Sequence, residues 1–310
     1  MATAKLNRPP RIAVDGVLLL DKPAGMTSNA ALQNARRLLN ARKAGHTGTL
    51  DPLASGLLPL TLGEATKFSQ MLLDADKVYE AGIRLGIETD SGDAEGNVLA
   101  TKPVAVDEAT LRYALARFTG EIEQIPPMYS ALKRNGKPLY EYARAGIELE
   151  RAPRKVTLSE CALLRFDGCR LDVRVACSKG TYIRSLAIDI GRALGCGAHL
   201  DALRRTRIGA FDVSQAVTPD ALDAAAPDNR TALLAPVDTL VAAFPRLDLD
   251  PDAARLILQG QPLAPQKTTA GKSAPGGCVR LYGPAGFLGL GQWKDDGHDG
   301  QLWPKRLIAH

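Results

Sequence analysis

The chain has 310 residues, of which 45% are hydrophobic and 24% are charged, values close to those of ordinary globular proteins. This composition excludes a mainly disordered chain, and the length favours a large domain followed by a smaller one. The longest early apolar run, residues 17–20, is too short for a signal peptide or a membrane span, so we expect a cytoplasmic protein with no membrane partner.

The net charge of +5 is unevenly distributed along the chain. Residues 1–50 hold eight basic and two acidic residues, and residues 130–155 hold seven basic and three acidic residues. Two basic zones of this kind suit a polyanionic partner. Charge alone is equally consistent with ordinary solvated surfaces, so any function has to be inferred from specific residues.

Hydrophobic patterning predicts strands and helices in the first part of the chain. In order, these are a strand from Gly16, a helix capped by Thr27 or Ser28, a strand at 56–63, a short helix at 64–73, a strand at 78–85 and a helix at 107–119. Gly120 is expected to end the last of these helices. In the strand at 78–85, Tyr79 alternates onto the apolar side, which favours a core position for its ring.

The segment TYIRSLAIDIGRALG, residues 181–195, predicts a helix closed by Gly195 and preceded by a strand in LDVRVAC. Tyr182 and Arg184 lie off the apolar stripe of this helix, in its first turn. They are therefore free for a role other than filling the core.

The C-terminal part differs from the rest of the chain. After about residue 250, a short helix at 253–258 and three apolar, glycine-punctuated runs predict a small β-rich module. We expect a domain at 1–245, with a basic, aromatic insertion at about 125–152, and a second domain at 246–310.

The loop GHTGTLDPLASG, residues 45–56, presents a single acidic residue, Asp51, among glycines and before a proline. An ionised carboxylate on such a loop can act as a nucleophile or a base, whereas the structural alternative is an aspartate that caps its own turn. In a closed pocket the carboxylate would need a cation beside it to stay charged, and Arg184 is a sensible partner.

Metal and cofactor chemistry has no support in the sequence. The four histidines show no ligand spacing, the five cysteines form no C-x-x-C pair, and no Walker or dinucleotide fingerprint opens a helix after a strand. The segment TDSGDAEGN lacks the order of a calcium loop, so we interpret Asp90, Asp93 and Glu95 as a solvated acidic turn. We expect neither a metal nor a cofactor.

Several segments together resemble the TruB-type family of bacterial tRNA pseudouridine-55 synthases. They are GVLLLDKPAGMTS, GHTGTLDPLASGLLPLTLGEATKFSQ, KVYEAGIRLG, EIEQIPPMYSALKRNGKPLYEYARAGIE, CSKGTYIRSLAIDIG and GCGAHLDALRRT. The resemblance implies an α+β fold: a pseudouridine synthase catalytic domain with a mixed, mostly antiparallel central sheet flanked by helices, plus a small β-rich, PUA-like RNA-binding domain. It also implies site residues, namely Asp51, Arg184 and Tyr79 as catalytic and His46, Tyr182 and Leu203 as substrate-binding; the lysine and proline of DKP are interpreted as structural.

The implied activity is isomerisation of uridine to pseudouridine at position 55 in the T-loop of tRNA, on a flipped-out base and without a cofactor. The implied partner is the T-arm stem-loop, and we expect a monomer that needs no guide RNA. Two alternatives stay open: a hydrolase of the nucleoside N-glycosidic bond, and an RNA-binding or tRNA-chaperone module with an inert pocket. The guide-RNA-dependent relatives of archaea and eukaryotes share the aspartate loop, but the basic insertion argues against that class.

Overall fold

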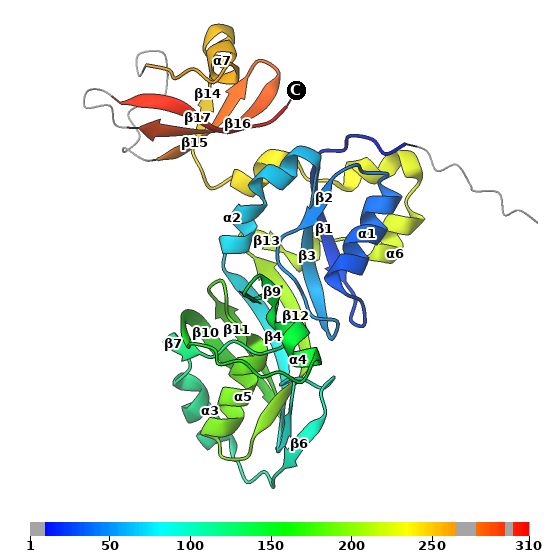
Figure 1. Cartoon of the computed structure of the whole chain (residues 1–310), viewed down its shortest axis with the longest axis vertical. Helices are drawn as coiled ribbons and strands as arrows, with labels where there is room; N and C mark the ends of the chain where they lie inside the picture. The colour runs from blue at the N-terminus through cyan, green and yellow to red at the C-terminus, as the bar shows by residue number, and fades with distance from the viewer. Residues whose placement is uncertain (1–9, 265–276, 295–299, 310) are drawn as a thin grey trace, which may run out of the picture.

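The computed structural model describes residues 10–264, 277–294 and 300–309 (Figure 1). These residues form a large N-terminal unit around one sheet and a small C-terminal unit around another. The large sheet is mixed and mostly antiparallel with helices packed against it, so the predicted α+β class is confirmed.

The large sheet has nine strands in the described residues. Its spatial order is β1 (Gly16–Lys22), β3 (Ala54–Leu62), β12 (Ala198–Ile208), β4 (Lys77–Leu85), β11 (Arg170–Cys177), β10 (Arg154–Phe166) and β7 (Gly120–Gln124), with β2 (Ala44–His46) beside β3 and β13 (Phe211–Asp212) beside β12. Among the described strands of this sheet, β3 and β12 form the only parallel pair. There Leu203 pairs with Ala54, which brings two distant parts of the chain side by side in the sheet.

The helices and short 3-10 turns of the N-terminal unit connect these strands. They are α1 (Ser28–Leu38), η1 (Gly63–Phe68), α2 (Ser69–Asp74), α3 (Glu108–Ala116), α4 (Leu139–Arg144), α5 (Ile183–Ala193), η2 (Val213–Gln215), α6 (Pro219–Ala224), η3 (Pro227–Leu233) and η4 (Val237–Val241). Helices α3 and α5 pack on the part of the sheet that contains β10, β12 and β4, whereas α1 and α6 lie beside β1 and each other (Figure 1).

Most of the local predictions are confirmed. Thr27 caps α1 by accepting a hydrogen bond from the Ala30 N–H at 3.1 Å, and Gly195 follows α5 with a φ of +78°. The predicted end of α3 at Gly120 is wrong. The helix ends at Ala116 because the next residues tighten into i→i−3 hydrogen bonds, and Gly120 instead opens β7.

The insertion at 125–152 carries little regular structure. It contains a two-strand hairpin, β8 (Lys133–Arg134) and β9 (Lys137–Pro138), followed by α4. A second hairpin, β5 (Ile87–Thr89) and β6 (Val98–Thr101), lies after β4 and carries the acidic turn at 90–97 in its connection.

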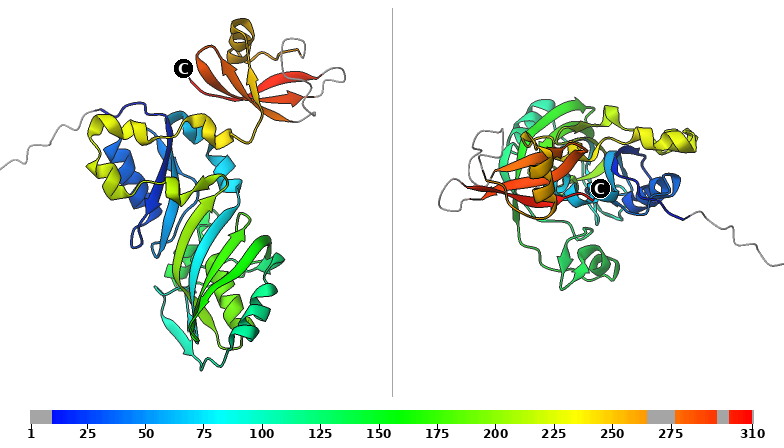
Figure 2. Two further views of the ribbon diagram at one scale, coloured as in Figure 1. Left: turned by 180° about the vertical axis from the view of Figure 1, so that it is seen from behind. Right: turned by 90° about the horizontal axis from the view of Figure 1, so that it is seen from above.

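The C-terminal unit has a four-stranded sheet and a core of its own. Its elements are β14 (Arg246–Asp248), α7 (Pro251–Leu258), β15 (Cys278–Gly283), β16 (Gly286–Lys294) and β17 (Gln301–Leu307). Figure 2 shows this sheet from behind and from above, next to the end of the large unit that contains α2. The contact includes the Phe68 and Phe287 rings, tilted at 55° with 5.8 Å between centroids, and a hydrogen bond from Lys67 Nζ to the Leu307 carbonyl at 2.9 Å.

Candidate active site

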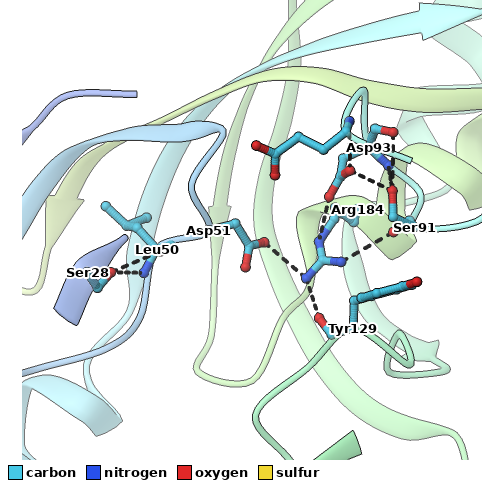
Figure 3. Close-up of polar contacts among 8 residues, drawn as sticks. Ser28, Leu50, Asp51, Ser91, Asp93, Tyr129 and Arg184 are labelled. Carbon is cyan, nitrogen blue, oxygen red and sulfur yellow. Dashed lines mark hydrogen bonds and ion pairs between the residues drawn. The ribbon is translucent and has the colours of Figure 1, made fainter. Parts of the chain in front are cut away.

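Asp51 lies on the loop between β2 and β3, and that loop is fixed on both sides of it. The Ser28 hydroxyl, at the start of α1, donates to the Leu50 carbonyl at 2.9 Å and accepts from the Leu50 N–H at 2.8 Å (Figure 3). The Gly25 N–H donates to the Pro52 carbonyl at 2.8 Å. The turn before α1 and the start of α1 therefore hold the backbone on both sides of Asp51 in place.

Arg184, in the first turn of α5, reaches this loop. Its Nη2 lies 3.0 Å from Asp51 Oδ2, so the expected ion pair is present (Figure 3). The arginine side chain is 6% exposed, whereas that of Asp51 is 40% exposed. Among the residues that the structure describes, Asp51 Oδ1 accepts no hydrogen bond. One carboxylate oxygen is thus held by the cation and the other is open.

A second carboxylate, Asp93, lies against the same guanidinium. Asp93 Oδ2 is 3.6 Å from Arg184 Nε, and its other oxygen accepts from Ser91 Oγ at 2.6 Å and from the Glu95 N–H at 3.1 Å (Figure 3). The interpretation of Asp93 as part of a solvated turn is wrong, because its side chain is only 6% exposed, although Asp90 and Glu95 are exposed as expected. A buried guanidinium needs several acceptors, and the sequence gives no sign of which ones.

The remaining acceptors of Arg184 are backbone carbonyls. Nη1 donates to Ser91 at 3.3 Å and Nη2 donates to Tyr129 at 2.6 Å (Figure 3). Tyr129 belongs to the insertion, so the arginine touches the Asp51 loop, the acidic turn and the insertion at once.

Tyr79 lies in β4 with its ring buried, and burial raises the pKa of its phenol, which keeps the hydroxyl neutral. The guanidinium of Arg205, the residue opposite Tyr79 on β12, partly opposes this shift through its positive charge. Arg205 is 1% exposed and donates to the carbonyls of Leu57 at 2.8 Å and Gly48 at 3.1 Å. It therefore joins Tyr79 to the loop of Asp51, a link for which the sequence offered no signal beyond the LRRT segment.

The expected substrate-binding residues are less tightly grouped. Tyr182 directly precedes α5 and is half-buried, which raises the pKa of its hydroxyl. Leu203 is partly buried at the junction of β3, β12 and β4. His46 lies at the end of β2, opposite Leu60, and forms no hydrogen bond or ion pair with the other predicted site residues in the described part of the chain. Burial and the charge of Arg205 lower the pKa of His46, so it is neutral near pH 7.

Lys22 has its ammonium group inside the protein near Asp51. Burial lowers its pKa to about 8, opposed by the negative charge of Asp51. Its Nζ donates to the carbonyls of Pro23 at 2.8 Å and Met26 at 2.6 Å, so it ties together the turn before α1. This agrees with the interpretation of the DKP segment as structural.

No cluster of three or more His, Cys, Asp or Glu residues in the described ranges could hold a metal ion. No helix in those ranges is long and apolar enough to cross a membrane.

Comparison with known proteins identifies the chain's relatives. The sequence profile of the TruB family pseudouridylate synthase N-terminal domain matches residues 36–183, that of the tRNA pseudouridylate synthase B C-terminal domain matches 184–242, and that of the pseudouridine synthase II TruB C-terminal region matches 245–308. A protein of Aromatoleum aromaticum named tRNA pseudouridine synthase B is 64% identical over all of this chain and 97% of its own length. A Burkholderia mallei protein of the same name is 58% identical over 97% of this chain and 96% of its own.

Solved structures agree with the sequence comparison. A structure titled as an H/ACA RNP bound to a substrate RNA containing 2′-deoxyuridine matches with a TM-score of 0.71 and 27% identity, over 95% of this chain and 85% of that one. A Cbf5-Nop10-Gar1 complex matches with a TM-score of 0.68 and 31% identity, over 90% of this chain and 78% of that one. The mixed sheet, the C-terminal β-rich unit and the full-length relatives all point the same way: the chain belongs to the TruB family of pseudouridylate synthases.

Proposed function

We propose that this protein isomerises uridine 55 in the T-loop of tRNA to pseudouridine. In this reaction the bond from C1′ of the ribose to N1 of uracil breaks, the base turns and C5 bonds to C1′. C5 then loses its proton and N1 gains one, so substrate and product have the same composition. The tRNA substrate follows from the names of the full-length relatives, and position 55 follows from the resemblance of the motifs.

The observation that carries the proposal is the Asp51–Arg184 pair. A carboxylate with one oxygen on a buried guanidinium and one oxygen open can meet a sugar carbon or a base atom as a nucleophile or a base. The permanent positive charge of Arg184 balances the carboxylate as RNA covers the site and removes water. Asp51 is thus the reacting group, and Arg184 orients it and balances its charge.

Tyr79 supplies the aromatic surface for the extruded base. Flipping a base costs a few kcal/mol of stacking, and stacking on an aromatic side chain returns about 1–3 kcal/mol. The Tyr79 ring is packed in the core of the large unit beside Arg205, so it enters the reaction already oriented. Tyr182 and Leu203 then border the base, and His46 contacts the RNA loop near the vacated position.

The basic insertion and residues 246–310 bind the RNA, and we propose that residues 246–310 form a PUA-like domain. Phosphate contacts from the insertion position the T-arm without reading its sequence, whereas bases splayed from the loop are recognised by stacking and edge contacts. We propose that the protein acts as a monomer, with neither guide RNA nor cofactor.

The test uses tRNA that carries 5-tritiated uridine, the purified protein alone and EDTA in the buffer. We expect tritium to appear in water while the base stays attached to the RNA. Release of free uracil would identify a glycosidic hydrolase, and binding without any release would identify a chaperone. The same assay on an isolated T-arm stem-loop tests independence from a guide RNA.

A further inference from the structure

The root of the insertion, residues 124–130, is hydrogen-bonded to the first turn of α5. The side-chain oxygen of Gln124 accepts from the Tyr182 N–H at 3.1 Å, and its side-chain nitrogen donates to the Tyr182 carbonyl at 3.3 Å. Ser185 Oγ donates to the Ile125 carbonyl at 2.9 Å. The Tyr129 carbonyl accepts from Arg184 Nη2 at 2.6 Å, so these contacts surround the arginine that pairs with Asp51 (Figure 3).

Gln124 is suited to joining the sheet to this helix. It is the last residue of β7, where its backbone pairs with Arg154 of β10, and it is 2% exposed. Tyr182, the residue before α5, makes no side-chain capping bond of its own. An amide side chain can both donate and accept, so it satisfies both backbone groups of Tyr182, which a carboxylate or an apolar side chain cannot do.

We infer that Gln124 is a positioning residue for catalysis: it fixes the first turn of α5, and through it the Arg184 guanidinium, to the root of the RNA-gripping insertion. The inference rests on the proposed function, because it assigns Arg184 to the reacting pair. Its consequence is that the geometry of the Asp51–Arg184 pair depends on this buried amide, which lies where the insertion begins. Removal of the amide should therefore slow the chemical step more than it weakens RNA binding.

The first experiment compares the wild type with Gln124→Leu, which removes both hydrogen bonds at similar size. We expect the single-turnover rate of pseudouridine formation to fall about tenfold, the effect of leaving one buried polar group unpaired next to the site. The dissociation constant for tRNA, from filter binding, should stay within about twofold. An unchanged rate would overturn the inference, as would a loss of affinity with the rate at saturation intact.

The second experiment uses Gln124→Glu and does not depend on the leucine variant folding. A protonated carboxyl group, like the amide, donates once and accepts once, whereas the ionised form only accepts. Burial raises the pKa of such a carboxyl group, while Arg154, opposite it on β10, and the Tyr182 N–H that donates to residue 124 lower it. Arg184 and Asp51 act with opposite signs on the adjacent Tyr182 hydroxyl. Tyr182, which faces it, stays neutral in this range. The rate of the variant relative to the wild type should therefore rise as the pH falls from about 7 to about 5. A constant ratio would show that the hydrogen bonds do not position the catalytic pair.

The matched control is Gln70→Leu, which changes an exposed glutamine on α2 whose side chain donates a hydrogen bond to Asp74 at 3.0 Å. It should leave rate and affinity unchanged. If the wild type itself released no tritium, the proposed function would fail. If the wild type and Gln124→Leu were equally active, only the role of Gln124 would fail.

Discussion

The side chain of Arg184 is buried, at 6% exposed, whereas the Asp51 carboxylate that it contacts at 3.0 Å belongs to a side chain that is 40% exposed. The cation lies behind the carboxylate, held by backbone carbonyls and by Asp93. The carboxylate faces outward from a loop fixed at Leu50 and Pro52. The pair therefore has one rigid side and one side open to a substrate, and this asymmetry leads to the following predictions.

Asp51→Asn keeps the shape of the side chain but removes its charge. We expect the single-turnover rate to fall about 10⁴-fold or more, as when a reacting carboxylate is lost elsewhere. The affinity for tRNA should change by less than about threefold, because the phosphate contacts remain. Asp220→Asn, at an exposed position on α6, is the control that should retain full activity. A fully active Asp51 variant would falsify the proposed role.

Arg184→Met removes the buried cation and leaves Asp51 and Asp93 without their partner. Breaking a buried ion pair costs about 3–5 kcal/mol, and the lower end applies here because Asp51 is half open to water. Urea unfolding should therefore show a loss of about 3 kcal/mol in the free energy of unfolding, together with a large loss of turnover. A variant as stable as the wild type would contradict the burial of this charge.

Asp93→Asn tests the second carboxylate. The amide can still accept from Ser91 but no longer balances Arg184, so we expect a drop of about tenfold in the rate constant, smaller than that for Asp51. Asp90→Asn, in the same turn but exposed, is the matched control. Equal effects of the two substitutions would mean that the turn acts as a whole and that the contact with Arg184 is unimportant.

The lowered pKa of Lys22 implies that the stability of the protein depends on pH. The pKa of Lys22 is about 8 in the folded protein against 10.5 for the ordinary side chain, because its ammonium group is buried. Between these values the unfolded chain binds the extra proton, so Lys22 contributes a rise of about 3 kcal/mol to the free energy of unfolding as the pH increases across that window. This contribution should be missing from Lys22→Met. Urea titrations at about pH 8 and pH 10.5 measure the difference, and parallel profiles would contradict the assignment.

We expect the basic residues of the insertion to make the affinity for tRNA depend on salt concentration. Lys133 and Arg134 are exposed on its hairpin, and replacing both with glutamine should reduce the slope of log affinity against log salt by about one to two. Arg112→Gln, on α3 and paired with Glu108, should leave the slope unchanged. Equal slopes for the wild type, the double variant and Arg112→Gln would show that the insertion does not contact the RNA phosphates.

The sequence predicted those features that depend on neighbouring residues. Alternation placed Tyr79 on the buried side of β4, the Thr27 signal located the start of α1, and the off-stripe position of Arg184 marked it as available. These patterns arise from the period of a strand or helix, so they can be detected along one segment.

The features that the sequence could not predict depend on distant segments meeting. Asp93 looks like any acidic turn residue until the fold brings the Arg184 guanidinium against it. The roles of Arg205 and Gln124 could not be predicted for the same reason. Each forms hydrogen bonds to groups on another element, and neither lies in a periodic pattern of its own. A charged or amide side chain in a strand gives no local sign that it will be buried.

The parallel junction of β3 and β12 also bears on how the protein reaches its active form. It is the only parallel pairing among the large sheet's described strands, and next to it Arg204 forms an ion pair with Asp21, 183 residues away in sequence. Contacts of such high separation close long loops and form late, which slows folding. A newly made chain thus gains its local helices and hairpins early, whereas Arg205 of β12 reaches the Asp51 loop only once this junction has formed.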